Sequence, residues 1–182
     1  MSPSRFKGPL SGLAAVWILA WLPAAPALAA DAGRTAAAPP ARISALVEAG
    51  SFAADALMVR EKKIPILVFY TRHDCPWCER VRRQYLLPMA NDPAWADRVI
   101  IREIDVGTDF VTPLTDFGGR TTTHSAFART RRVKLVPTLD FLDDRGNRLA
   151  EPIVGMRTPD FYAAAIERAI EDSLAKLGHT SK

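Results

Sequence analysis

Residues 64–78 read IPILVFYTRHDCPWC, and this stretch decides the fold. Its first part, Ile64–Tyr70, is continuously apolar and rich in β-branched and aromatic residues, which is typical of a strand buried on both faces. The run ends at Thr71-Arg72-His73-Asp74, and Cys75-Pro76-Trp77-Cys78 follows at once. From Cys78 onward the apolar residues recur at helical spacing. The sequence therefore predicts two cysteines at the junction between a buried strand and an amphipathic helix.

The rest of the chain alternates between helical and extended patterns. We expect two short helices or turns over 42–60, the second near 51–61 with Ser51 as its N-cap. The remaining expected elements are a helix after Cys78 that ends or kinks at Pro88, a short helix over 93–97, a strand over 99–106, an irregular loop over 107–123, a helix near 125–132, strands over 138–142 and 149–154, and a closing helix with Thr158 as N-cap. This order, a βαβ half followed by a hairpin and a closing helix, predicts a three-layer α/β sandwich.

The first 29 residues have the pattern of a secretory signal peptide. Basic residues precede an apolar run at 10–22, and an A-x-A site ending at Ala29 follows. The run is shorter than the roughly 20 residues that span a membrane comfortably. We therefore expect cleavage after Ala29 or Ala30, which leaves no stable membrane span; an uncleaved anchor is the alternative. Residues 30–41 are predicted to be a flexible lead-in, 42–178 the folded domain and 179–182 a tail.

The composition excludes several classes of protein. The 182 residues are 48% hydrophobic and 24% charged, which fits one globular domain rather than a disordered chain or a multi-span membrane protein. A net charge of +4 without a dense basic stripe, and without a zinc-finger or RNA-recognition signature, argues against a nucleic-acid partner. Two cysteines are too few for a disulfide-dense scaffold or a site with four thiolates.

The chemistry predicted from the sequence lies in Cys75 and Cys78. At the start of a helix the first sulfur faces unpaired N–H groups and the positive end of the helix dipole, which favour the thiolate. The first cysteine is then a nucleophile toward disulfides and the second resolves the mixed disulfide. Such a pair needs no organic cofactor, because the disulfide itself carries two electrons. Two alternatives stay open: a purely structural disulfide, and a Cu(I) site built from both cysteines, with His73 as a further candidate ligand.

The motifs ILVFY-TRHDCPWC, FARTRRVKLVPTLDFLDDRGNRL and VGMRT, taken together, resemble the thioredoxin superfamily. The resemblance implies a thioredoxin-like three-layer α/β/α sandwich with a mixed central sheet. It also implies that Pro137 is a cis-proline beside the active-site disulfide, and that Val136 and Pro137 shape a groove for the substrate peptide. With its signal peptide, the chain is most similar to bacterial periplasmic thioredoxin-like proteins, including those associated with sulfur-oxidation operons. The implied partners are client proteins with thiols or disulfides, and a membrane electron-transfer protein.

Two residues depart from the pattern of that superfamily. Phe69 stands where many thioredoxins carry a buried acid, so we expect the proton of Cys78 to pass to water, a thiolate or a group nearer the surface such as His73. Asp74 precedes Cys75 in place of the common aromatic residue, and its charge opposes thiolate formation unless it points to solvent. The candidates that tune the thiol pKa are His73 and Arg72.

The remaining candidate positions receive weaker roles. Trp77 is a candidate partner contact, or else covers a hydrophobic rim. His124 and His179 lie in a polar loop and a tail and receive no role. The basic residues between 129 and 134 are interpreted as a solvated face.

Overall fold

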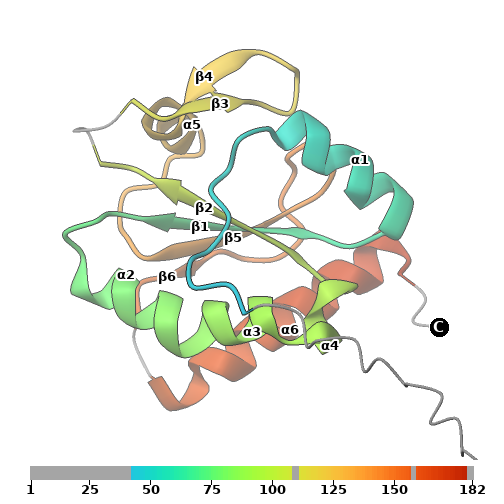
Figure 1. Ribbon diagram of the computed structural model, residues 1–182. Helices are drawn as coiled ribbons and strands as arrows, with labels where there is room; N and C mark the ends of the chain where they lie inside the picture. The colour runs from blue at the N-terminus through green and yellow to red at the C-terminus, as the bar shows by residue number, and fades with distance from the viewer. Residues whose placement is uncertain (1–41, 108–110, 157–158, 180–182) are drawn as a thin grey trace, which may run out of the picture. The chain divides into compact units, whose positions relative to one another are not determined.

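A computed structural model of the chain describes residues 42–107, 111–156 and 159–179 (Figure 1). The predicted signal peptide, the whole predicted lead-in and the predicted N-cap Thr158 lie outside the described residues. Within the described part of the chain, no helix combines the length and the apolar character that crossing a membrane requires.

The sheet is built around β1, Ile66–Thr71, whose six residues are all buried. β1 pairs in parallel with β2, Ile100–Asp105, and antiparallel with β5, Thr138–Leu142. The short strand β6, Ile153–Val154, pairs antiparallel with β5, which gives the order β2-β1-β5-β6. Figure 1 shows helices on both faces of this sheet. The predicted three-layer sandwich with a mixed central sheet is therefore confirmed.

The helix that follows the cysteines runs from Pro76 to Asn91 without a break. It begins as α2, Pro76–Val81, continues as the π-helical segment η1, Arg82–Leu86, and ends as α3, Leu87–Asn91. Pro88 does not end it; Pro88 comes just after the π-helical segment, in which the hydrogen bonds already depart from the α-helical pattern. The π-helical turn marks the place where the hydrogen-bond pattern changes ahead of the proline.

The other helices lie close to their predicted positions. α1 is capped by the Ser51 hydroxyl and α4 by the Asp92 carboxylate, both as predicted, whereas the cap of α5 is Thr123. The closing helix packs its apolar side against the core through residues such as Ile166 and Ile170. The bounds are α1 Phe52–Lys62, α4 Pro93–Ala96, α5 His124–Thr130 and α6 Pro159–Leu177.

Three predictions of secondary structure need correction. Residues 42–50 form no helix; they run beside β2, where the Ala49 N–H donates to the Glu103 carbonyl at 2.9 Å. The predicted loop 107–123 contains a hairpin of β3, Pro113–Thr115, and β4, Thr121–Thr123, whose strands are too short to give a clear alternation. The predicted strand 149–154 is shorter in the structure and consists of β6 alone. Between the Asp143–Asn147 turn and β6, only an isolated bridge joins Arg148 to Leu142.

Aromatic stacking holds the β3–β4 hairpin against the domain. The Phe117 ring stacks on the Phe52 ring of α1, with centroids 4.8 Å apart and planes 2° from parallel. Gly146 also approaches Phe117: a Cβ built on this glycine would lie 2.7 Å from the ring. Gly146 also has φ +81°, a conformation that side chains other than glycine adopt at a cost.

We expect Gly146→Ala to lower the free energy of unfolding by about 2–4 kcal/mol, because left-handed strain and a clash with Phe117 add together. Gly119→Ala is the matched control. Gly119 has φ +79° but nothing within 4 Å of a built Cβ, so only the strain of about 1–2 kcal/mol applies. Urea unfolding of both variants measures the difference. Equal losses would contradict the close packing of Phe117 on Gly146.

Candidate functional site

Three chain segments meet at one edge of the sheet. The register pairs Tyr70 with Thr138, which places Pro137 across from Thr71 at the end of β1. The parallel register of β1 with β2 pairs Thr71 with Asp105 at the end of β2. Cys75 follows four residues after Thr71, so the cysteines, the start of β5 and the end of β2 share this edge. The Val136–Pro137 peptide bond is cis, as the resemblance implied, with Pro137 buried and Val136 half-buried.

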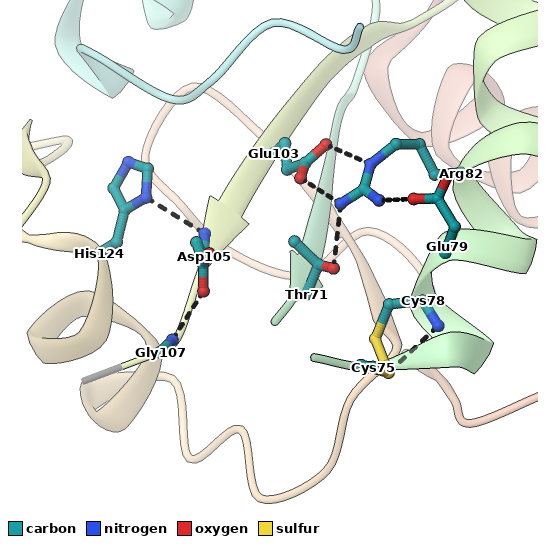
Figure 2. Close-up of polar contacts among 9 residues, drawn as sticks. All are labelled: Thr71, Cys75, Cys78, Glu79, Arg82, Glu103, Asp105, Gly107 and His124. Carbon is teal, nitrogen blue, oxygen red and sulfur yellow. Dashed lines mark hydrogen bonds and ion pairs between the residues drawn. A yellow bond between two sulfur atoms is a disulfide. The ribbon is translucent and has the colours of Figure 1, made fainter. Parts of the chain in front are cut away.

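Cys75 and Cys78 are joined by a disulfide at the N-terminus of α2, with Cα atoms 5.2 Å apart. Cys75 is the N-cap, and its Sγ accepts a hydrogen bond from the Cys78 N–H at 3.1 Å (Figure 2). Cys75 is partly exposed, whereas Cys78 is fully buried. The geometry offers one sulfur to an incoming molecule and hides the other. An N–H that points at Sγ of Cys75 also favours negative charge on that atom.

The loop before Cys75 carries a local ion pair. The Arg72 guanidinium contacts the Asp74 carboxylate at 2.5 Å, and both side chains are about half-exposed. The hydrogen bond from Arg72 lowers the pKa of Asp74, so this carboxylate is charged at neutral pH. The Asp74 side chain is about half-exposed to solvent, and the Arg72 guanidinium neutralises its charge. The sequence analysis assigned opposite effects on the thiolate to Arg72 and Asp74. In the structure these two residues form an ion pair with each other.

His73 and Trp77 occupy the exposed side of the motif. His73 is exposed, and its Nδ1 would lie 3.6 Å from a Cβ built on Gly107, which follows β2. Trp77 is 54% exposed, and the Arg80 guanidinium lies over its ring at 5.9 Å from the centroid. An exposed indole next to a partly exposed sulfur offers an apolar contact surface to a protein partner.

The structure adds a partly buried ion pair that the sequence analysis missed. Phe69 is fully buried in β1, and Glu103 of β2 lies directly across from it in the register. The Glu103 carboxylate accepts hydrogen bonds from Nε and Nη2 of Arg82 at 3.1 and 2.5 Å. Arg82 is one helical turn beyond Cys78, because its N–H donates to the Cys78 carbonyl. That the proton of Cys78 passes to water, a thiolate or His73 stays a prediction. No local pattern links two residues 21 positions apart.

His124 also needs correction, because it is a buried residue and not part of a polar loop. Its side chain is 1% exposed at the start of α5. Nδ1 accepts from the Asp105 N–H at 3.2 Å, so Nε2 carries the proton and donates to the Ala49 carbonyl at 2.8 Å. His124 thus ties the end of β2, next to the motif, to the segment that leads into α1.

The predicted solvated basic face is correct only in part. Arg129, Arg132 and Lys134 are exposed. Arg131 turns inward instead and donates to the fully buried Asp140 at 3.0 Å. His179 also has a contact, since its Nδ1 lies 3.1 Å from the Lys62 carbonyl. Among residues 42–107, 111–156 and 159–179, no three His, Cys, Asp or Glu side chains group together as a metal site would require.

We expect Asp74→Asn to raise the thiolate fraction of Cys75 in the reduced protein at pH 7, because the change removes a negative charge and releases Arg72. Thiolate absorbance at 240 nm, followed from pH 4 to 10, measures it. Asp144→Asn is the control: Asp144 pairs with Arg60 in the turn after β5, at the opposite end of the sheet. A titration curve of Asp74→Asn that overlays those of the control and the wild type would contradict the prediction.

Comparison with known proteins places the chain in a family. A family model described as a thioredoxin-like domain matches residues 52–170. No curated protein sequence matches significantly. Similar solved structures include thioredoxin O2 from Arabidopsis thaliana (21% identity, 70% of this chain and 93% of that chain, TM-score 0.45), a DsbH oxidoreductase (21%, 70% and 86%, 0.48) and Trichomonas vaginalis thioredoxin (23%, 69% and 95%, 0.44). Because the family match spans more than half of the sequence and includes both cysteines and Pro137, the chain belongs to the thioredoxin-like domain family.

Proposed function

We propose that the protein is a thiol–disulfide oxidoreductase that exchanges disulfides with client proteins through Cys75 and Cys78. The observation that carries this proposal is the asymmetry of the pair. Cys75 is partly exposed and its sulfur accepts an N–H at the start of a helix, while its bonded partner Cys78 is fully buried one turn further on. A disulfide that only cross-links the chain needs neither feature.

The exchange balances without a cofactor. In the reduced protein, the Cys75 thiolate attacks one sulfur of a client disulfide, and the other client sulfur leaves as a thiolate and takes up a proton. Cys78 then loses its proton and attacks Sγ of Cys75, which closes the protein disulfide and releases the second client thiol. Two electrons and two protons pass to the client. The reverse sequence oxidises a client dithiol and leaves Cys75 and Cys78 reduced.

Exposed apolar side chains near the motif support a protein substrate. Trp77 and Leu135 are 54% and 64% exposed, and Leu135 directly precedes Val136 and Pro137. On the neighbouring strand, Val154 is 42% exposed and pairs with Thr138. We assign the client peptide to the surface formed by Trp77 and Val136, with the buried Pro137 shaping that surface and Leu135 at its rim. An extended apolar contact of this kind suits a peptide chain better than a small polar molecule.

The proposed location is the bacterial periplasm. The N-terminal signal sequence directs export and is then cleaved. The support is the order of basic residues, short apolar run and A-x-A site in residues 1–30. An oxidising compartment also matches a protein whose two cysteines form an exchangeable disulfide. A membrane electron-transfer protein is the proposed source or sink of electrons, because each exchange leaves the pair in the other redox state.

Cys78→Ser should accumulate mixed disulfides with client proteins through Cys75, because the resolving thiol is missing. Cys75→Ser should accumulate few, because Cys78 is buried. Non-reducing electrophoresis of tagged protein, followed by mass spectrometry of the adducts, measures this, with the double variant as the control for non-covalent capture. Equal trapping by both single variants would overturn the assignment. So would a reduction potential of the pair below about −300 mV, which is typical of structural disulfides.

Protein recovered from the periplasmic fraction of a bacterial host should begin at Ala30 or Asp31, because cleavage follows the A-x-A site. Intact-mass measurement checks the new N-terminus. Ala29→Leu is the matched variant, since a large residue next to the cleaved bond should block processing. A full-length species in the membrane fraction of the wild type would contradict the prediction.

A further inference from the structure

The Arg82 side chain contacts several residues near the cysteines. Besides its two hydrogen bonds to Glu103, it donates to the Thr71 hydroxyl at 3.3 Å and contacts Glu79 (Figure 2). Its guanidinium also lies over the Phe69 ring, 5.7 Å from the centroid. The Arg82 and Glu103 side chains are only 19% and 15% exposed. The hydrogen bond to Glu103 raises the pKa of Arg82 further, so the guanidinium stays charged.

The position of this ion pair relative to the disulfide follows from the helix. The Arg82 N–H donates to the Cys78 carbonyl, so the two residues are one turn apart. Side chains at i and i+4 lie on the same face, with Cβ atoms about 5–6 Å apart. Both face the sheet: Cys78 is fully buried, and Arg82 reaches β1 and β2. The third contact, Thr71, is the last residue of β1, four positions before Cys75.

We infer that the Arg82–Glu103 pair sets the redox equilibrium of Cys75 and Cys78, with Arg82 favouring the dithiol form and Glu103 opposing it. The inference rests on the proposed exchange function. The equilibrium is protein disulfide plus two glutathione thiols against protein dithiol plus glutathione disulfide. Only the right-hand side places thiolate charge on the protein. A cation near the sulfurs therefore favours the dithiol, and an anion favours the disulfide.

Burial gives the two charges their effect. Charges that are largely withdrawn from water are screened much less than exposed ones. Glu79 also contacts Arg82, but its side chain is 51% exposed and therefore counts for less. Glu103 is thus the main group that neutralises Arg82. Both are positioning residues, since they act on the sulfurs through charge rather than through contact with the client.

The test is the equilibrium constant of the purified protein in glutathione buffers, read by alkylation of free thiols and gel shift. Glu103→Gln should shift the equilibrium about three- to tenfold toward the dithiol, and Arg82→Gln by a similar factor toward the disulfide. A tenfold shift corresponds to about 30 mV for this two-electron couple. The double variant Arg82→Gln/Glu103→Gln should return close to the wild type, and Arg82→Lys, which keeps the charge, should stay close to it.

Asp55→Asn is the matched control. Asp55 forms an ion pair with Arg102, the residue before Glu103; these side chains are 7% and 19% exposed, and Arg102 points to the opposite face of β2. This variant should lose stability and keep the wild-type redox equilibrium. If the Arg82–Glu103 pair were merely structural, its variants would likewise lose stability and keep the wild-type redox equilibrium.

Shifts of Arg82→Gln and Glu103→Gln in the same direction, or no shift in folded protein, would overturn the inference. If Arg82→Gln does not fold, Glu103→Gln decides alone, since only a shift toward the dithiol agrees. A wild-type disulfide too stable for glutathione is measured against dithiothreitol instead. A wild-type potential below about −300 mV would overturn the proposed function, while the ratios between variants would still test this inference.

Discussion

Burial of β1 on both faces is the constraint on which the rest of the structure depends. All six residues from Ile66 to Thr71 are buried, so their backbone N–H and C=O groups must be paired on both edges. β2 and β5 supply those pairs. This arrangement fixes where the chain leaves the sheet after Thr71. Cys75, Pro137 and the end of β2 therefore meet at the same end of the sheet, although no local sequence pattern encodes this meeting.

The two faces of β2 carry two different ion pairs. Arg102 and Glu103 are neighbours in the chain, and strand geometry points their side chains in opposite directions. Arg102 binds Asp55 of α1, and Glu103 binds Arg82 beside the cysteines. Removing one partner from either pair would leave a charge largely out of water, which is costly. The pairs thus hold a helix against each face, and the pair on the cysteine side adds an electrostatic role.

The β3–β4 hairpin and α5 brace the edge where the cysteines lie. His124 joins Asp105 at the end of β2 to Ala49, and its ring has to be neutral to accept the Asp105 N–H. Phe117 stacks on Phe52 of α1 and fixes the hairpin from its other end. Asp105 also accepts a hydrogen bond from the Gly107 N–H at 2.7 Å, and Gly107 lies beside Arg72 and His73 of the loop before Cys75.

The sequence by itself determined the buried strand, the cysteine motif at a helix start, the caps Ser51 and Asp92, and the strand after Pro137, because each depends on neighbouring residues. Only the tertiary structure decided the pairing of Arg82 with Glu103, the burial of His124 and the inward turn of Arg131. These features join residues from different elements, and side-chain type alone does not reveal which charged group finds a partner. The hairpin at 113–123 was missed for a related reason. Strands of three residues carry too little periodicity, and contacts with Phe52 and Gly146, rather than local preference, hold the hairpin in place.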